Sequence, residues 1–598
     1  MQNILVVVDM QNDFIDGSLG TAEAVEIVEK VAEKIRTFEG KIFYTRDTHG
    51  EDYLETREGR SLPVEHCIRG TDGWQIRPEL CRGTADMEIV DKPTFGSSEL
   101  AEKLAALDQE EKIKTVTLVG LCTDICVISN AMAIRAFLPE AEIVVDASCC
   151  AGVTPQSHER ALAAMKACQV IVTGERKKNE AQLLLEFIEK SPSPFHVIQN
   201  LRGMYMEAGY EEIDEKETWQ IRQGGKYFTV RNGSSLIAFA VPEKEIKGFH
   251  MTAAHSDSPT FRIKEKPEMT VEEHYVKLNT EKYGGMILTT WMDRPLSAAG
   301  RVTFLEDGKV ACRLVDVDRD LLVIPSLAAH MSRDAKNTEY NPQVDMLPLY
   351  ACGNKKDFMQ AAARAAGVEE ENLLSCDLFL YVRERGRILG AEGELILSPK
   401  LDDLQCVYTS ARAMACSMPG EYVNVCAVFD NEEVGSGTKQ GADSTFLEDV
   451  LQRIAESLGM SGSEYRQKIA ASFMISADNA HAVHPNHPEK ADPTNRPYIN
   501  GGIVVKFHGS QKYATDAFSA GVLKKICRQA EVPCQTYANR SDIAGGSTLG
   551  NLSTAHVSVP TVDIGLPQLA MHSAVETAGV QDTEYAVKMF EEFFGGQF

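Results

Sequence analysis

The 598-residue sequence predicts an α/β protein with more than one domain, and three observations support this prediction. The first is length, because a single hydrophobic core stops growing at roughly 250–300 residues. The second is that short Val- and Ile-rich runs alternate with amphipathic stretches over residues 1–175, as in a parallel sheet covered by helices on both faces. The third is that strands and helices alternate again from Ser398 onward, after a strand-rich region that ends near residue 350.

The N-terminal elements follow from their apolar patterns. Five buried strands are expected at residues 4–8, 41–44, 115–119, 142–145 and 170–173, and helices at 22–37, 99–107 and 156–167. Sites in parallel sheets form at the carboxyl ends of the strands. Asp9, Asp47 and the segment 120–126 all follow expected strand ends, so we expect them to share a site. The charged segment 175–180 marks the expected domain junction.

Composition excludes several classes of partner. A formal net charge of −26 argues against nucleic acid or an anionic membrane. No apolar run approaches the roughly 18 residues of a membrane span, and the first residues lack the basic stretch of a signal peptide. The 15 Cys include no CxxC pair, which disfavours a redox or metal-storage protein. Reduced thiols and a cytoplasmic location are therefore expected.

Carboxylates and imidazoles follow apolar runs throughout the C-terminal region. Taken singly, each is typical of a solvent-exposed side chain, but together they would converge in an α/β core. Burying an unpaired carboxylate costs several kcal/mol after relaxation, so such a cluster requires protonation or cations. Two divalent ions about 3.5–4 Å apart, with one carboxylate between them, would neutralise it. The residues concerned are His255, Asp402-Asp403, Glu432-Glu433, Asp478 and His572.

Several longer motifs in a fixed order make residues 178–598 resemble the aspartyl aminopeptidase family of metallopeptidases. They are Ser191-Pro-Ser-Pro-Phe195-His196, His255-Ser-Asp257-Ser-Pro259, Trp291-Met-Asp293-Arg294-Pro-Leu296, Asp430–Ser436, His481-Ala-Val-His484-Pro485-Asn486 and Met571-His572-Ser573. The resemblance implies a dinuclear metallopeptidase domain formed by residues 178–262 and 392–598. A β-rich oligomerisation domain, residues 263–391, would be inserted into it. The resemblance also implies a homo-oligomer, since members of the family assemble as dodecamers.

The resemblance implies two divalent ions in the peptidase site, for which Zn, Mn and Co all remain open. Asp402 would lie between them. The other ligands would be two pairs, Glu433 with His572 and His255 with Asp478.

Further roles follow from the same resemblance. Glu432 would be the general base that takes a proton from the attacking water, and Asp257 would orient a metal-binding histidine. Lys506 would face the first side chain of the substrate and favour Asp or Glu, the alternative being a strand-end lysine in solvent. His484 would lie on the substrate side, and His330 would reach the site of a neighbouring subunit. The substrates would be peptides with free N-termini.

In the N-terminal region, Cys126 has the surroundings of a nucleophile. It stands between an expected strand and helix, in Val119-Gly-Leu-Cys122-Thr-Asp-Ile-Cys126-Val127. A helix N-terminus and a nearby cation both lower the pKa of a thiol. Since an unperturbed thiol is only about 3% thiolate at pH 7, such activation is useful. Lys92 can supply the charge, and Asp9 can accept the thiol proton.

These residues make residues 1–175 resemble the isochorismatase-like cysteine hydrolases, and nicotinamidases most closely. The other matching stretches are Asp9-Met-Gln-Asn12-Asp13-Phe14, Asp47-Thr-His49 and His66-Cys-Ile-Arg-Gly70-Thr71. The resemblance implies one divalent ion, Zn, Mn or Fe, bound by Asp47, His49 and His66, which would hold the pyridine nitrogen of nicotinamide. Tyr53 stands near the place of a further histidine in many nicotinamidases, and Glu58 would contribute through water.

The implied mechanism begins with attack of Cys126 on a carboxamide. Ammonia leaves with a proton from Asp9, and water then hydrolyses the thioester. Backbone N–H groups of Cys122 and Cys126 would form the oxyanion hole, and a cis peptide bond is expected before Cys122. Phe14 and Trp74 would either stack on the substrate ring or belong to the core.

The leading interpretation is a bifunctional cytoplasmic hydrolase. One half would remove N-terminal, preferably acidic, residues from peptides, and the other would deamidate nicotinamide to nicotinate. The alternative is that the N-terminal domain hydrolyses another small amide or is a non-catalytic assembly module.

Overall fold

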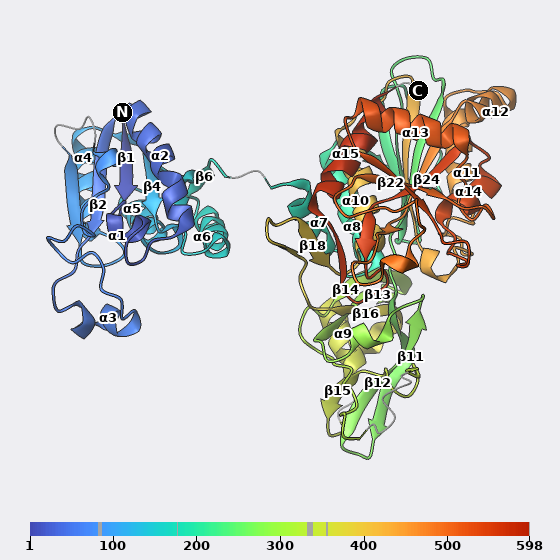
Figure 1. Ribbon diagram of the computed structural model, residues 1–598, viewed down its shortest axis with the longest axis horizontal. Coiled ribbons are helices and arrows are strands. Elements are labelled where there is room, and N and C mark those ends of the chain that lie inside the picture. The colour runs from blue at the N-terminus through green and yellow to red at the C-terminus, as the bar shows by residue number, and fades with distance from the viewer. Residues whose placement is uncertain (82–86, 176–177, 332–338, 355–356, 597–598) are drawn as a thin grey trace. The chain divides into compact units, whose positions relative to one another are not determined.

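The computed structural model describes residues 1–81, 87–175, 178–331, 339–354 and 357–596. The chain forms two compact units, Met1–Lys177 and Lys178–Phe598, which are coloured blue to teal and teal to red in Figure 1. Residues 176 and 177 of the expected junction lie outside the described residues. None of the described helices is long and apolar enough to cross a membrane.

The first unit is a doubly wound parallel sheet, as predicted. Its order is β3-β2-β1-β4-β5-β6, and every neighbouring pair is parallel. Helix α2 (Ala22–Thr37) covers one face, and helices α4 (Ser98–Glu110), α5 (Ile128–Phe137) and α6 (Pro155–Ala167) cover the other. The strands are β1 (Gln2–Val8), β2 (Lys41–Asp47), β3 (Glu88–Lys92), β4 (Ile113–Leu121), β5 (Glu142–Ala151) and β6 (Ile171–Thr173).

Strand β1 shows why this sheet buries both faces. Ile4, Val6 and Val8 join one hydrophobic core, while Leu5 and Val7 join the core on the opposite face. Successive side chains of a strand alternate between faces, so a continuous apolar run fills both cores. The carboxyl ends of β1 to β4 therefore meet at one edge of the unit.

The second unit is built on a nine-stranded sheet of order β23-β22-β24-β20-β10-β19-β9-β8-β7. Helices α7 (Glu180–Glu189), α8 (Pro194–Glu207), α10 (Leu401–Cys416), α13 (Ala517–Gln529) and α15 (Val580–Gly595) cover one face. Helices α11 (Phe446–Ser457), α12 (Gly462–Ala470) and α14 (Leu549–His556) cover the other. The strands are β7 (Glu211–Glu212), β8 (Lys226–Arg231), β9 (Ser235–Ala240), β10 (Gly248–His255), β19 (Tyr422–Phe429), β20 (Phe473–Ala477), β22 (Ile503–Phe507), β23 (Cys534–Ala538) and β24 (Thr561–Gly565).

Between β10 and α10 the chain forms a second, antiparallel sheet with its own core. Its order is β14-β13-β16-β11-β12-β15, and helix α9 (Phe358–Ala366) packs on it (Figure 1). Its strands are β11 (Thr260–Val271), β12 (Tyr275–Tyr283), β13 (Leu296–Glu306), β14 (Lys309–Asp316), β15 (Leu349–Cys352) and β16 (Leu373–Val382).

A small sheet of order β17-β18-β26-β25-β21 lies next to the region of the predicted metal-binding residues. Strand β26, the last of these along the chain, begins at Glu576, four residues after His572. The strands are β17 (Arg387–Leu389), β18 (Leu395–Ser398), β21 (Ala480–His481), β25 (Pro567–Leu569) and β26 (Glu576–Gly579).

Candidate active sites

Five different chain segments deliver the expected metal-binding residues of the second unit to one place. They form two groups, within each of which the ligand atoms lie within 4.8 Å of one another. Strands β10, β19 and β20 run side by side, with β10 parallel to both of its neighbours, so their carboxyl ends coincide. The groups are His255, Asp402, Asp403 and Asp478, and Asp402, Glu433 and His572.

Asp402 belongs to both groups, and its two oxygens face different imidazoles. Oδ1 lies 3.5 Å from Nε2 of His255, and Oδ2 lies 3.4 Å from Nε2 of His572. Nε2 of His255 also lies 4.0 Å from Oδ1 of Asp478, and Nε2 of His572 lies 3.5 Å from Oε2 of Glu433. A carboxylate shared in this way is what a pair of neighbouring cations requires.

The buried charges of this cluster fit divalent ions. Asp402 Oδ1, Asp403 Oδ1 and Glu433 Oε1 are buried without a hydrogen-bond donor among the described residues. Burial raises the pKa of Asp403 and of Glu433 well above the usual values, so an uncompensated cluster would have to take up protons. Asp402 differs, because the two imidazoles outweigh burial and lower its pKa. Carboxylates and imidazoles are ligands that Zn, Mn and Co accept.

The orientation of His255 also suits a metal ligand. Its Nδ1 lies 3.1 Å from the carbonyl oxygen of Asp257 and 3.4 Å from Oδ1 of the same residue. A proton held on Nδ1 leaves the lone pair of Nε2 directed at Asp402 and Asp478.

Glu432 and Glu433 lie together in a 3-10 turn, η6 (Glu432–Val434), directly after β19. Asn431 and Gly435 flank the turn with φ of 64° and 96°, which lets both carboxylates point to the cluster instead of to opposite faces. Asp257 holds the turn, since Oδ1 accepts the Glu432 N–H and Oδ2 the Glu433 N–H, both at 3.1 Å. Burial raises the pKa of Glu432 to about 7, which suits a proton acceptor near neutral pH.

A cavity of about 330 Å³ opens onto the cluster. Lys506 is 3% exposed there, and its Nζ lies 3.3 Å from Oδ2 of Asp478. His484 does not line this cavity; it lines an adjoining one of about 490 Å³, which shares His481, Tyr513, Tyr537 and Gly546 with the first. His330 is exposed and lines neither cavity.

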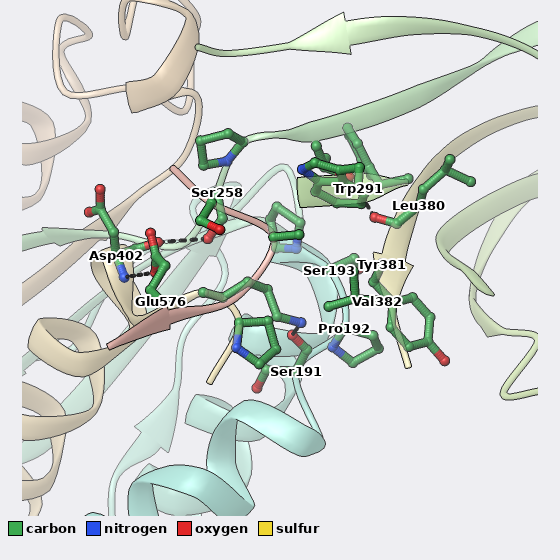
Figure 2. Close-up of a pocket in the computed structure, with 18 of the residues that line it drawn as sticks. Ser191, Pro192, Ser193, Ser258, Trp291, Leu380, Tyr381, Val382, Asp402 and Glu576 are labelled. Atoms are coloured by element: carbon green, nitrogen blue, oxygen red, sulfur yellow. Dashed lines mark hydrogen bonds between the residues drawn. The ribbon is translucent and has the colours of Figure 1, made fainter. Parts of the chain in front are cut away.

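A third, narrow pocket is lined by Ser258, Asp402 and Glu576 (Figure 2). Glu576 reaches the metal cluster from this side. Its Oε2 accepts the N–H of Asp402 at 3.0 Å, and its Oε1 accepts the N–H of His572 at 2.8 Å. The Ser258 hydroxyl donates to the carbonyl oxygen of Asp402 at 2.9 Å. Sequence reasoning missed Glu576, and the only signal was its position three residues after the last motif, Met571-His572-Ser573.

In the first unit, Asp9, Lys92 and Cys126 form one buried group. Lys92 Nζ lies 2.7 Å from Asp9 Oδ2 and 3.6 Å from Cys126 Sγ, and all three residues are at most 4% exposed. The hydroxyl of Thr45 donates to Asp9 Oδ1 at 2.7 Å. Cys126 occupies a turn of π-helix, η3 (Thr123–Val127), between β4 and α5.

The expectation of a lowered thiol pKa is wrong for this arrangement. Burial and the charge of Asp9 raise the pKa of Cys126 well above the usual value, and Lys92 opposes them only in part. Burial also raises the pKa of Asp9. An acceptor whose proton affinity is increased in this way suits direct transfer of the thiol proton to Asp9.

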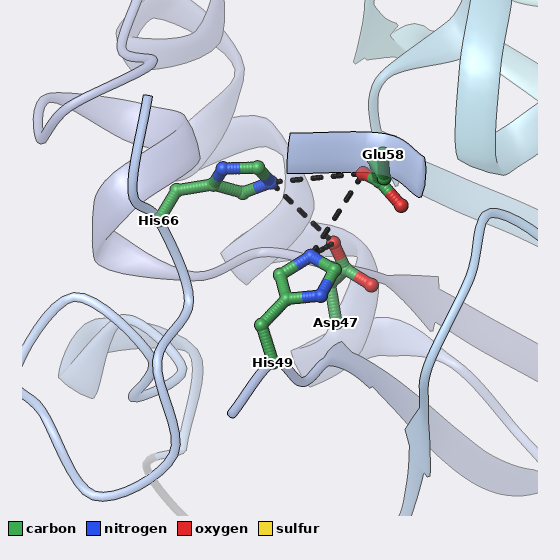
Figure 3. Close-up of side chains that lie close together, drawn as sticks. All are labelled: Asp47, His49, Glu58 and His66. Atoms are coloured by element: carbon green, nitrogen blue, oxygen red, sulfur yellow. Dashed lines mark hydrogen bonds and ion pairs between the residues drawn. The ribbon is translucent and has the colours of Figure 1, made fainter. Parts of the chain in front are cut away.

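A second cluster in the first unit joins the expected metal ligands to Glu58 (Figure 3). Asp47 Oδ2 lies 3.1 Å from His49 Nε2 and 3.8 Å from His66 Nε2. Glu58 Oε1 lies 3.8 Å from His49 and 4.0 Å from His66, close enough to be a direct fourth ligand. His66 Nδ1 lies 2.8 Å from the carbonyl oxygen of Val64, so Nε2 can present its lone pair. The set fits one divalent ion.

The structure places the other residues expected near this cluster in different surroundings. Tyr53 packs its ring 4.6 Å from that of His49, but its hydroxyl donates to the Leu62 carbonyl and is committed there. The Phe14 ring lies 5.5 Å from that of His66. Trp74 has one face covered by the guanidinium of Arg46, 3.4 Å from the ring centroid. The peptide bond between Leu121 and Cys122 is cis, as predicted.

Gln11 is a second residue that sequence reasoning did not single out. Its side-chain amide holds Asp47, accepting the Asp47 N–H at 2.7 Å and donating to the Asp47 carbonyl at 2.8 Å. The same Nε2 donates to the Trp74 carbonyl at 2.9 Å. Its position inside the Asp9–Phe14 motif was the only signal.

Comparison with known proteins gives the same division of the chain. Residues 187–594 match the model described as aminopeptidase I zinc metalloprotease (M18), and residues 3–176 match the isochorismatase domain. The "Probable M18 family aminopeptidase 2" of Clostridium acetobutylicum is 48% identical over 432 residues, covering 70% of this chain and 99% of the relative. That of Clostridium novyi is 46% identical over 424 residues, covering 69% and 98%.

Solved structures also resemble the second unit. The Ape4 and Nbr1 complex, solved by cryo-EM, matches at 37% identity with a TM-score of 0.67, covering 69% of this chain and 85% of that one. The mApe1 dodecamer of S. cerevisiae matches at 26% identity with a TM-score of 0.61, covering 69% and 96%.

Proposed function

The chain belongs to the M18 family of aminopeptidases and carries an isochorismatase domain ahead of it, and from this premise we propose that it is a bifunctional hydrolase. The second unit would remove acidic residues from peptide N-termini, and the first would deamidate nicotinamide. The observation that supports the peptidase most directly is Asp402, whose two oxygens face two separate ligand sets.

In the peptidase, we assign the groups around Asp402 to two divalent ions. When bound, these ions would polarise the scissile carbonyl and lower the pKa of the attacking water. Glu432 takes a proton from that water and passes it to the leaving amine nitrogen. Asp257 fixes the backbone of Glu432 and the ring of His255, so the proton acceptor and a ligand keep their relative orientation. Glu433, His572 and Asp478 complete the ligand sets.

Lys506 supports a preference for substrates with an N-terminal Asp or Glu. Its ammonium is buried in the wall of the cavity that opens onto the metal-binding residues, and it pairs with one carboxylate oxygen of Asp478. An acidic substrate side chain would pair with this cation in a place where water is largely excluded. We expect aspartyl and glutamyl p-nitroanilides to be cleaved with kcat/KM at least ten-fold above the leucyl substrate, in the presence of Zn, Mn or Co. Equal kcat/KM values for the three substrates would contradict the proposed preference for acidic residues.

We assign residues 178–262 and 392–598 to the catalytic domain and residues 263–391 to oligomerisation. Residues 263–391 expose large apolar side chains, on the strands and on their connecting loops, of the kind that association covers. A related structure is described as a dodecamer, and we propose a homo-oligomer of that size with His330 reaching a neighbouring site. The exposed side chains are Tyr275, Ile287, Leu305, Val310, Leu327, Val344 and Leu374.

For the first unit we propose a cysteine-dependent amidohydrolase. Cys126 attacks the carboxamide carbon while its proton passes to Asp9, and Asp9 returns that proton to the departing ammonia. Water, losing its proton to Asp9, then cleaves the thioester and frees the acid and the thiol. A divalent ion bound by Asp47, His49, Glu58 and His66 would hold the substrate's ring nitrogen. The backbone N–H groups of Cys122 and Cys126 would stabilise the oxyanion.

Ammonia release by the intact chain tests this assignment. Nicotinamide should be hydrolysed and benzamide, which lacks the ring nitrogen, should not. If only other small amides are hydrolysed, the assignment as an amidohydrolase stands and the assignment of nicotinamide as its substrate is wrong. No ammonia release from any amide, together with two bound ions per chain instead of three, would indicate that the unit is an assembly module.

All 15 cysteines are free thiols, which supports a cytoplasmic location.

A further inference from the structure

The inserted sheet sends one segment directly against the metal-binding residues. Strand β12 ends at Tyr283, and the chain then passes through Gly284 and Gly285. The N–H of Ile287 donates to the carbonyl oxygen of His572 at 3.0 Å. A Cβ placed on Gly284 would lie only 3.0 Å from the Cβ of Glu433. The insert therefore contacts two of the expected ligands of one ion.

The hydroxyl of Tyr283 occupies the centre of this contact. It donates to Oδ2 of Asp257 at 2.8 Å, and it accepts from Nδ2 of Asn431 at 2.8 Å. Both partners belong to the catalytic domain, whereas Tyr283 comes from the insert. The single hydroxyl proton is directed to Asp257, so the lone pair that faces Asn431 is fixed as well.

Asp257 transmits this contact to three residues of the site. It is 0% exposed, and its carboxylate accepts the backbone N–H groups of Glu432 and Glu433 and faces the ring of His255. A buried carboxylate with so many partners has one orientation in which all are satisfied. Loss of the Tyr283 hydroxyl would leave Asp257 free to turn toward its other donors.

Asn431 transmits the same contact to the turn that carries both glutamates. It adopts φ of 64°, directly before Glu432. Its Oδ1 accepts from the hydroxyl of Thr438 at 2.8 Å and from Nε2 of Gln440 at 2.7 Å, while its Nδ2 donates to Tyr283. The hydroxyl of Tyr283 thus completes the hydrogen bonding of a residue that fixes the turn.

We propose that Tyr283 is a positioning residue of the peptidase site, through which the inserted domain sets Asp257 and Asn431 and, with them, the direction of Glu432, Glu433 and His255. The packing of the insert thereby becomes part of the catalytic geometry. This inference rests on the proposed peptidase function.

The test compares Tyr283→Phe with Tyr350→Phe in the full-length chain. Tyr350 is a matched control, because its hydroxyl also donates to a carboxylate, Asp357 Oδ1 at 2.7 Å. Asp357 belongs to the insert, whereas the carboxylate bound by Tyr283 accepts the N–H groups of Glu432 and Glu433. We expect Tyr283→Phe to lower kcat by roughly ten-fold to a hundred-fold with KM within about two-fold, the loss typical of a hydrogen bond to a charged group. Tyr350→Phe should retain the wild-type kcat.

A second readout does not depend on turnover. The visible absorption spectrum of the Co²⁺-loaded protein reports the ligand geometry, and equilibrium dialysis gives the Co²⁺ dissociation constant. Tyr283→Phe should change the spectrum and weaken binding at least three-fold, whereas Tyr350→Phe should change neither. A wild-type kcat and spectrum in Tyr283→Phe, or equal losses in both variants, would overturn the inference.

A glycine pair supplies an independent arm should Tyr283→Phe fold poorly. Gly284 and Gly308 have φ of +79° and +76°, so alanine is comparably strained at both. Only Gly284→Ala pushes against Glu433, since nothing lies within 4 Å of the Cβ position at Gly308. Gly284→Ala should weaken Co²⁺ binding and Gly308→Ala should not; equal binding by both would count against the contact. Wild-type protein whose peptidase site holds two Co²⁺ ions yet which cleaves no peptide would defeat the proposed function, while the spectra still decide the role of Tyr283.

Discussion

Asp47 and Lys92 form an ion pair, with Oδ1 3.3 Å from Nζ, while the other oxygen of Asp47 faces the imidazoles of the metal cluster. The same carboxylate therefore contacts the expected metal site and the lysine that contacts the Cys126 thiol. In the proposed mechanism, one side chain would therefore set both the position of the ion and the position of the lysine next to Cys126. Removing that side chain should disturb both groups at once.

Asp47→Asn should lose the bound ion of the first unit and lower amide hydrolysis by at least about 100-fold. The amide lacks the negative charge that both the ion and Lys92 require. Asp91→Asn is the control, because Asp91 lies on the neighbouring strand β3 and pairs with Arg46 at 2.8 Å, away from the thiol. Elemental analysis and ammonia release measure the two effects. Full ion content in Asp47→Asn would contradict the assignment.

Cys126→Ala should abolish ammonia release while leaving peptide cleavage by the same chain unchanged. In the proposed mechanism the thiol is the attacking group, and its Sγ lies 3.6 Å from Lys92 Nζ. Cys150→Ala, which removes a buried thiol from the same core, should keep the amidase activity. Residual turnover of Cys126→Ala above one percent would show that another group attacks the amide.

Glu432→Gln should reduce peptidase kcat by about 10²–10⁴-fold, the contribution of a general base, with both ions retained. The amide keeps the shape of the side chain but cannot take the proton. Glu448→Gln, on the exposed face of α11, serves as the control. Turnover and metal content are measured on the same preparation. Near-normal turnover would exclude Glu432 as the base.

Glu576→Gln should weaken metal binding in the peptidase site by at least about ten-fold. Its carboxylate accepts the N–H groups of both Asp402 and His572, and an amide would present a donor to one of them. Glu584→Gln on α15, whose carboxylate is exposed and pairs with Lys588, provides the comparison. Titration with Zn²⁺ in competition with a chelator measures the change, and unchanged affinity would argue against the backbone contact.

His250 should make the stability of the second unit sensitive to acid. Burial lowers its pKa from 6.5 to about 4, and its ring stacks on that of Tyr422 with centroids 3.9 Å apart. Between pH 6.5 and 4 the unfolded chain binds the proton that the folded one refuses, so stability is full above pH 6.5 and falls as the pH decreases. The total loss is on the order of 3 kcal/mol.

His250→Phe keeps a stacking ring and removes the titration, so its unfolding temperature should fall less between pH 7 and pH 5 than that of the wild type. Calorimetry at several pH values measures this difference. His274→Phe, at an exposed position in a turn of the insert, should retain the wild-type acid sensitivity. Parallel curves for the wild type and His250→Phe would mean that another group carries the effect.

The sequence predicted those parts of the fold and site that local patterns and motifs specify. The Val-rich run of β1 predicted a strand buried on both faces, and the order of the carboxylate motifs predicted that Asp402, Glu433 and Asp478 converge. Strand β3 was not predicted, because Glu88–Lys92 carries three charged residues and has no apolar run. Its pairing with β2 places it at the edge of the sheet, and this strand order cannot be read from the sequence alone.

Other features depend on three-dimensional burial, which spacing does not reveal. The pKa of Cys126 was expected to be low, yet the depth of the site raises it. Glu576 and Gln11 act through backbone N–H groups, and such contacts leave no pattern of residue types in the chain. Tyr283 lies 26 residues from Asp257 and 148 residues from Asn431 along the chain, so no local motif could connect them.

Because one polypeptide carries both compact units, translation fixes their ratio at one to one. Any assembly built through the peptidase portion would display as many thiol-bearing units as it has subunits. Their local abundance would then depend on the number of associated chains instead of on expression of a separate enzyme. Variants that dissociate such an assembly would disperse both units together.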